Sequence, residues 1–339
     1  MGFFSFTQEV AMDLGTANTL IIYNDKIVVD EPSVVALDKR TDKLIAFGEK
    51  ARLMQGKENE GIRTVRPLRD GVIADFHAAE LLIRSIIKMI PSKNLFFTPS
   101  LKMVVSIPSG STEVEIRAVR DSAEHAGGRE VYMIYEPMAA AIGIGIDVES
   151  PSGCMIVDIG GGSTEIAVIS LGGIVSNKSI RIAGDDLTAD IIEYMSRMHN
   201  LKVGERTAET IKIMVGSALT DLEDPPEDYI VRGPNRMTAL PMEVPVSYQE
   251  IAHCLEKSIS KIEAAILSAL EQTPPELYSD IVERGIYLAG GGALLRGLSK
   301  RLTDKLNIQF HIAEDPLKAV ARGTGIALKN VDRFGFLIR

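Results

Sequence analysis

Two glycine turns that each follow an aspartate, one in each half of the chain, constrain the fold more than any other feature. The first turn runs from Asp13 to Thr19 and the second from Asp158 to Glu165, and each lies between two hydrophobic strands. Glycine permits a tight reversal, so main-chain N–H groups can point at anionic oxygens while the aspartate lies where a hydrated metal ion would bind. Either turn alone is typical of an ordinary hairpin, and neither is a P-loop, because no Gly-Lys-Ser/Thr follows. The duplication predicts a phosphate tail held from both sides.

The composition is that of a folded protein in a reducing compartment. With 339 residues, 45% of them hydrophobic and 24% charged, the chain is long enough for two domains or one bilobed unit. A net charge of -9 argues against nonspecific nucleic-acid binding and against membrane contact driven mainly by anionic lipid. Cys154 and Cys254 fit no metal-ligand spacing, and we expect no disulfide. The chain has no run of about 20 apolar residues and no signal-peptide pattern, which predicts a cytoplasmic protein.

Strands and helices alternate along the first half. Hydrophobic runs predict strands over residues 10–13, 19–23, 27–29, 103–107 and 131–135. Asn24 and Asp25 supply a hairpin signal between two of these strands. Helical spacing of apolar residues predicts a helix over 77–90 that Pro91 ends, and Thr112 with Glu115 forms a capping box that opens another helix.

The second half repeats this order. Strands are predicted over residues 154–158, 165–170, 174–176 and 286–289, with a long periodic helix over 247–271. A triple glycine, Gly290 to Gly292, follows the last of these strands. Two similar halves of this kind predict an α/β protein with two mixed sheets and a cleft between them, where ligands of open α/β sheets collect.

With both glycine turns, Glu136-Pro137 and the late triple glycine in chain order, the sequence resembles the actin, sugar kinase and heat-shock ATPase superfamily. Within it, the chain is similar to the MreB family of bacterial actins, the rod shape-determining proteins. The matching strings lie at residues 12–19, 67–76, 135–143, 156–171, 207–212, 216–218, 288–296, 313–316 and 320–324.

The resemblance implies an actin-like ATPase fold of class α/β. Two related, ribonuclease H-like lobes would each contain a mixed β-sheet and helices, with the nucleotide in the central cleft. The implied subdomains are IA (1–32, 67–150 and 317–339), IB (33–66), IIA (151–184 and 247–316) and IIB (185–246).

The resemblance also implies the roles of individual residues. Asp13 and Asp158 would hold Mg²⁺ through water, and Glu136 would position the attacking water as part of a catalytic group with Asp158 and Ser163. Taken without the resemblance, Glu136 is a carboxylate favoured at a helix N-terminus by the dipole. Ser163 stands where the family usually carries threonine, so the hydroxyl is kept and a methyl is lost. The implied nucleotide contacts are Gly15, Thr16, Ala17, Asn18, Gly160, Gly161, Gly162, Ser163, Gly184, Asp185, Glu209, Lys212, Gly290, Gly291, Gly292 and Ala293.

Glu209 and Lys212 lie three residues apart on a predicted helix, so both can face one side. The resemblance places them against the ribose and purine, and the alternative is a solvated ion pair. The chain departs from the family at Ile213 and Met214, where polar residues are common.

Two apolar clusters are expected at exposed positions, which is unusual for loop tips. They are Phe3, Phe4 and Phe6 at the N-terminus and Leu95, Phe96 and Phe97 in a loop. The resemblance implies that both contact the inner face of the cell membrane. The alternative is that both fold onto the protein surface.

The resemblance implies a filament-forming protein that binds and hydrolyses ATP, or GTP, with Mg²⁺ and organises cell-wall elongation to maintain rod shape. Its partners would be copies of itself in antiparallel double filaments, the cytoplasmic membrane and cell-wall elongation membrane proteins, but no nucleic acid. A sugar or acetate-type kinase of the same fold is the alternative, although no substrate-deprotonating motif stands out. A heat-shock chaperone is less favoured, because the chain ends soon after the final ATPase motif.

Overall fold

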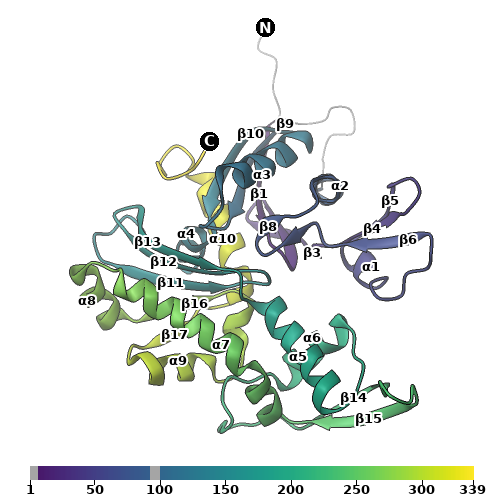
Figure 1. Ribbon diagram of the computed structural model, residues 1–339. Coiled ribbons are helices and arrows are strands. Elements are labelled where there is room, and N and C mark those ends of the chain that lie inside the picture. The colour runs from purple at the N-terminus through teal and green to yellow at the C-terminus, as the bar shows by residue number, and fades with distance from the viewer. Residues whose placement is uncertain (1–6, 92–99) are drawn as a thin grey trace.

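Two lobes, each built on a five-stranded mixed sheet, lie on either side of a central pair of helices (Figure 1). The computed structural model describes residues 7–91 and 100–339. The sheet of the first lobe has the strand order β10-β9-β1-β2-β3, and that of the second lobe has the order β13-β12-β11-β16-β17. This confirms the predicted α/β class and the mixed sheets.

The first lobe places helices on the outer face of its sheet. Its strands are β1 (Thr7–Leu14), β2 (Asn18–Tyr23), β3 (Lys26–Pro32), β9 (Ser100–Ile107) and β10 (Gly128–Tyr135), and its helices are α2 (Phe76–Ile87) and α3 (Glu113–His125). β1 pairs antiparallel with β2 and parallel with β9. Successive side chains of a strand point to opposite faces. Val10 and Met12 therefore pack with Leu82 of α2, while Ala11 faces the central helices.

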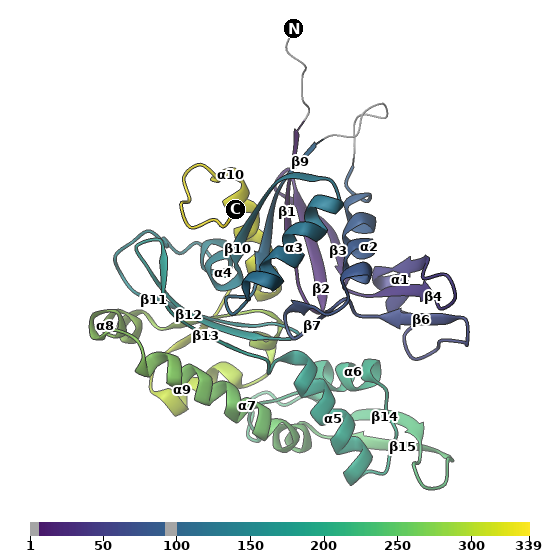
Figure 2. The same ribbon diagram turned by 45° about the horizontal axis from the view of Figure 1, so that its top comes forward.

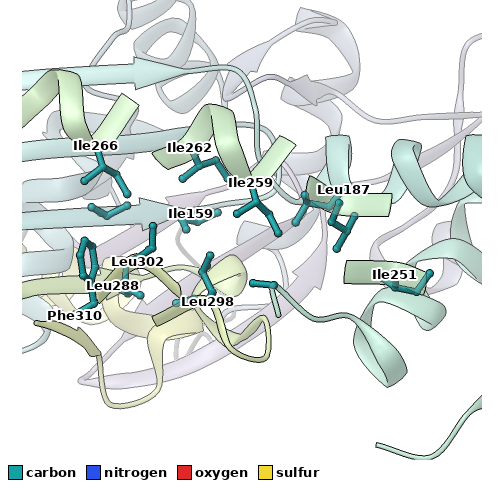
Figure 3. Packing of buried hydrophobic residues seen from close by; sticks show 14 of the residues in the cluster. Ile159, Leu187, Ile251, Ile259, Ile262, Ile266, Leu288, Leu298, Leu302 and Phe310 are labelled. Carbon is teal, nitrogen blue, oxygen red and sulfur yellow. The ribbon is translucent and has the colours of Figure 1, made fainter. Parts of the chain in front are cut away.

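The second lobe is built in the same way. Its strands are β11 (Cys154–Ile159), β12 (Thr164–Ser170), β13 (Gly173–Ile180), β16 (Ile286–Ala289) and β17 (Phe310–Ile312), and its helices are α7 (Tyr248–Glu271), α8 (Pro275–Arg284) and α9 (Leu298–Leu306). The predicted period of α7 places Ile259, Ile262 and Ile266 in one buried core with Leu288 and Phe310 (Figure 3).

The central pair consists of α4 (Glu136–Gly143) and α10 (Ala319–Lys329). A Cβ atom on Gly323 would lie 1.7 Å from the Ala139 carbonyl oxygen, and one on Gly143 would lie 1.9 Å from the Ala319 carbonyl oxygen. The helices therefore touch backbone to backbone where they cross. Their apolar side chains form one core with residues of both sheets, such as Ala11 of β1 and Ile156 of β11.

Each lobe carries a smaller part, and the two lie on the same side of the molecule (Figure 1 and Figure 2). On the first lobe, the small sheet contains β4 (Val35–Asp38), β5 (Leu44–Phe47), β6 (Ile62–Val65) and helix α1 (Gly48–Arg52), and the short hairpin β7 (Leu68–Arg69) to β8 (Val72–Ile73) follows it. On the second lobe are α5 (Gly184–Met198), α6 (Glu205–Val215), β14 (Tyr229–Pro234) and β15 (Pro241–Val246). The single-turn helices η1 (Gly291–Leu294) and η2 (Pro316–Lys318) follow β16 and β17. The exact subdomain boundaries stay a prediction.

Local predictions agree with this structure, except that several strands are longer than predicted and one helix is shorter. The capping box of Thr112 and Glu115 is present, and Asn24 and Asp25 form a turn with φ of 51° and 62°. Helix α2 ends at Ile87, three residues before the predicted end at residue 90. None of the described helices is both long and apolar enough to cross a bilayer. The six residues of the two apolar clusters, Phe3, Phe4, Phe6, Leu95, Phe96 and Phe97, lie outside the described residues.

Candidate functional site

The two glycine turns contact each other where the lobes meet. A Cβ atom on Gly161 would lie 2.9 Å from Ala17 Cβ, and one on Gly162 would lie 2.7 Å from Thr16 Oγ1. A side chain at either glycine would push the turns apart, so this approach requires glycine. The turns from the two halves therefore lie against each other, as a phosphate site shared between them would require.

A third turn, between β7 and β8, contacts both glycine turns. Its central residues, Asp70 and Gly71, have φ of 52° and 81°. The Gly71 amide donates to Thr16 Oγ1 at 3.0 Å, and a Cβ atom on Gly71 would lie 2.9 Å from Ser163 Oγ. The hairpin therefore donates to the hydroxyl of the first glycine turn and lies close to the hydroxyl of the second.

Several backbone amides of the glycine turns are available to a ligand. Over residues 7–91 and 100–339, the amides of Thr16, Ala17, Gly161 and Gly162 donate to no protein acceptor. Backbone amides that converge from facing turns form a concave site for anionic oxygens. The arrangement suits a phosphate group that bridges the lobes.

Four carboxyl groups lie beside these turns. Asp13 is the last residue but one of β1, Glu136 begins α4, and Asp158 and Glu165 come from β11 and β12. Burial raises the pKa of Asp13 to about 6, although Ser106 Oγ donates to its Oδ1 at 2.9 Å. Burial, reinforced by Asp13 and Glu165, raises the pKa of Asp158 to about 7. Burial and the other three carboxyl groups raise the pKa of Glu136 well above its usual range.

This group has the chemistry of a hydrated magnesium site. Within the described part of the chain, no three His, Cys, Asp or Glu side chains are arranged to hold a metal directly. Mg²⁺ usually keeps several waters and binds one or two carboxylates together with phosphate oxygens. Burial raises the pKa values of Asp13 and Asp158, and the nearby carboxylates Asp13 and Glu165 add to the effect at Asp158. A divalent cation would favour the charged form of both groups. The residues therefore fit Mg²⁺ held through water.

Helices α5 and α6 lie beside the second glycine turn. The amides of Gly184 and Asp185 donate to the carbonyls of Gly160 and Gly161 at 3.1 and 2.8 Å. Lys212 Nζ donates to the Gly184 carbonyl at 2.7 Å and pairs with Glu209 Oε2 at 2.7 Å. The Lys212 side chain is 15% exposed, so the pair is not simply solvated. It joins α6 to the first turn of α5 beside the second glycine turn.

The triple glycine packs on the end of β11. A Cβ atom on Gly290 would lie 2.4 Å from Asp158 Oδ1, and one on Gly292 would lie 2.2 Å from Ile159 Cγ2. Gly290 also has a φ of 77°. Both observations explain why glycine is needed beside the carboxyl group.

The predicted site residues among those described thus form one connected region at the junction of the lobes. The connection runs from the first glycine turn through the second glycine turn to α5, α6 and η1. The roles assigned to individual residues stay predictions.

Sequence reasoning missed two charged residues of this region. Glu165 is 1% exposed and accepts from the Ser109 amide at 3.0 Å and from Ser179 Oγ at 2.7 Å. A charged residue inside a buried strand is a usable signal, because charges are rarely buried without partners. Arg66, which pairs with Asp185 at 2.6 Å, gives no such signal in the sequence.

Comparison with known proteins identifies relatives over nearly the whole chain. The family described as MreB/Mbl protein matches residues 7–335. The cell shape-determining protein Mbl of Bacillus subtilis (strain 168) is 45% identical, covering 97% of this chain and 98% of its own. The cell shape-determining protein MreB of Escherichia coli (strain K12) is 46% identical, covering 97% and 96%.

Two solved structures share the fold. MreB5 of Spiroplasma citri bound to AMPPNP superimposes with a TM-score of 0.90 at 38% identity, covering 96% of this chain and 97% of its own. A MamK double helical filament gives a TM-score of 0.79 at 21% identity, covering 96% and 99%. The MamK likeness concerns the fold alone.

Proposed function

This chain belongs to the MreB/Mbl family of actin-like cell shape-determining proteins, and from that premise we propose that it binds and hydrolyses ATP in the cleft between its lobes. The observation that carries the proposal is the pair of facing glycine turns with free amides beside a group of carboxyl side chains. The MreB5 relative was solved with AMPPNP, an ATP analogue, which supports adenine nucleotide as the ligand.

The proposed binding mode follows from the charges of the site. The amides of Thr16, Ala17, Gly161 and Gly162 would hold the phosphates, and Asp13 and Asp158 would hold Mg²⁺ through water. The bound cation would neutralise phosphate charge and favour the ionised form of the nearby carboxyl groups. The sugar and base would lie toward Gly184, Glu209, Lys212 and the loop from Gly290 to Ala293.

Glu136 would position the water that attacks the terminal phosphate. It is the first residue of α4, and Pro137 fixes the backbone that follows it. Burial and the neighbouring carboxyl groups raise the pKa of Glu136 in the nucleotide-free protein. Glu136 would therefore ionise, and become able to accept a proton from water, only when the surrounding negative charge is reduced. Binding would in this way precede hydrolysis. Ser163 would contribute its hydroxyl from the second glycine turn, where Gly71 leaves room for it because a Cβ atom there would lie 2.9 Å from Ser163 Oγ.

We further propose that the protein assembles into double filaments on the inner face of the cytoplasmic membrane and there organises cell-wall elongation. The apolar residues of 3–6 and 95–97 would provide the membrane contact. Fully burying a phenylalanine gives roughly 1.5 to 3 kcal/mol, so one subunit would bind lipid weakly and a filament would bind through avidity. The relatives found are cell shape-determining proteins, so they support this function and give no support to the sugar or acetate kinase alternative.

Sedimentation and negative-stain imaging with Mg²⁺ and ATP, with and without liposomes, test the proposal. We expect double filaments that bind lipid, together with release of phosphate. Monomers under every condition, with ATP bound tightly, would refute filament assembly and favour the kinase alternative. The matched control is Asp158→Ala, which should lose Mg²⁺-dependent nucleotide binding.

A further inference from the structure

Arg66 joins the two lobes at the mouth of the cleft. It lies between β6 and β7, and its side chain is 18% exposed. Its Nη2 pairs with Asp185 Oδ2 at 2.6 Å, and its Nη1 pairs with Glu205 Oε1 at 2.8 Å. Asp185 and Glu205 lie in the first turns of α5 and α6, so one guanidinium connects the first lobe to two helices of the second. We call these two ion pairs the Arg66 clasp.

The clasp dominates the polar contacts between residues 33–66 and 185–246. Within the described residues, the only other hydrogen bond between these segments runs from Gln55 Nε2 to Glu205 Oε2 at 2.9 Å. A cavity of about 300 Å³, lined in part by Thr64, Arg66, Asp185 and Glu205, lies at the same place. The small sheet and the α5–α6 part are therefore held together here mainly by charge.

Asp185 connects the clasp to the proposed nucleotide site. Its amide donates to the Gly161 carbonyl at 2.8 Å, which anchors it on the second glycine turn. Only its Oδ2 is used by Arg66, and no described residue donates to Oδ1. A carboxylate can accept several hydrogen bonds, so Asp185 can be held by Arg66 and still accept from a sugar hydroxyl.

We propose that Arg66 is a positioning residue that holds the cleft closed over a bound nucleotide and thereby slows its release. The inference rests on the proposed nucleotide site and adds a residue that the sequence did not predict, whose Nη2 also donates to the Thr16 carbonyl of the first glycine turn at 3.5 Å. The clasp spans the path between the lobes, so it must open before a nucleotide that contacts both lobes can leave. Nucleotide entry also requires an open clasp, and the clasp is formed in this nucleotide-free structure, so losing Arg66 should speed dissociation and also association.

Stopped-flow kinetics with a fluorescent ATP analogue and Mg²⁺ test the clasp. Arg66→Gln should raise the dissociation rate about tenfold, which corresponds to about 1.4 kcal/mol. Its association rate should rise as well, because the clasp is formed in the nucleotide-free protein. Glu205→Gln, which keeps the pair with Asp185, should give a smaller increase. High salt should speed dissociation from the parent protein and have little effect on Arg66→Gln, because the ion pairs are partly exposed.

Arg63→Gln is the matched control. Arg63 pairs with Asp42 at 2.9 Å, and both residues belong to the small sheet and its turn, so this pair does not cross the cleft. Its loss should leave the dissociation rate unchanged. Equal dissociation rates for the parent protein and Arg66→Gln would overturn the clasp.

Hydrogen exchange of the nucleotide-free protein separates this inference from the proposed function. Arg66→Gln should speed exchange of the Asp185 amide even when no nucleotide is present. If the parent protein bound no nucleotide, the proposed function would fail. The exchange measurement would still show whether the clasp exists, because it needs no nucleotide. Unchanged exchange at Asp185 would overturn the clasp regardless of nucleotide binding.

Discussion

Replacing Gly323 with alanine should weaken the contact on which the two lobes meet. The new Cβ atom would lie 1.7 Å from the Ala139 carbonyl oxygen and 2.9 Å from the Gly143 amide nitrogen. Both are backbone atoms of α4, so no side chain can rotate away. Restoring a separation of 3.0 Å requires the helices to move apart by about 1.3 Å. Overpacking of this kind typically costs about 1 to 3 kcal/mol, and the backbone clash places this variant at the upper end.

The helix itself gains from the same substitution. Alanine in a helix interior is favoured over glycine by about 1 kcal/mol, so the net loss for Gly323→Ala should be about 2 kcal/mol. Gly325→Ala, two residues along α10, is the matched control. Its Cβ atom would lie 3.2 Å from Ile22 Cγ2, a methyl group that can shift. The control should keep most of the helix gain, and the two variants should differ by about 3 kcal/mol.

Thermal unfolding of the nucleotide-free proteins measures this difference. With an unfolding entropy of about 2.1 cal/mol/K per residue, about 3 kcal/mol corresponds to roughly 4 °C in Tm for a chain of this length. We expect Gly325→Ala to melt at or above the parent temperature and Gly323→Ala to melt below it. Equal melting temperatures for the two variants would refute the backbone contact between α4 and α10.

Three further perturbations address the site and the membrane contact. Asp158→Asn should stabilise the nucleotide-free protein increasingly as the pH rises from about 4 to above 7. The folded pKa of Asp158 is about 7, so the parent loses stability over that range while asparagine does not titrate. Denaturant unfolding at pH 5 and pH 8 should show the difference in free energy of unfolding between variant and parent widening to a few kcal/mol, and a constant difference would contradict the burial of an uncompensated charge. Glu136→Ala should retain nucleotide binding and release phosphate more slowly, so hydrolysis at the parent rate would reject its role. Replacing Phe96 and Phe97 by serine should detach filaments from liposomes without preventing assembly, and persistent lipid binding would point to the N-terminal phenylalanines.

Features encoded by neighbouring residues could be predicted from the sequence. The capping box of Thr112 and Glu115 and the turn at Asn24 and Asp25 each depend on side chains or backbone preferences within a few positions. The glycine turns could be interpreted only as a pair, because either turn alone is typical of an ordinary hairpin. Repetition in the two halves then predicted that the turns face each other.

Contacts between distant segments could not be predicted in the same way. Arg66 meets Asp185 and Glu205 across more than a hundred residues, and nothing in its local sequence distinguishes it from a surface arginine. The crossing at Gly143 and Gly323 also depends on how two helices approach in space. Local signals can also mislead, as the end of α2 at Ile87 shows. A downstream proline marks a position that a helix cannot easily pass, but the helix can end before it.

The core around α4 and α10 has a consequence for the independence of the two halves. Ala11 and Val104 from the first sheet, and Ile156 and Ala167 from the second, are buried in the same apolar cluster. Neither half could cover its inner face alone, because the other half supplies part of that cover. The two similar halves therefore depend on each other as the subunits of an obligate dimer do, although one continuous chain contains both. The halves are therefore expected to fold cooperatively. A half expressed alone would expose an apolar surface that the other half normally buries, and it would tend to aggregate.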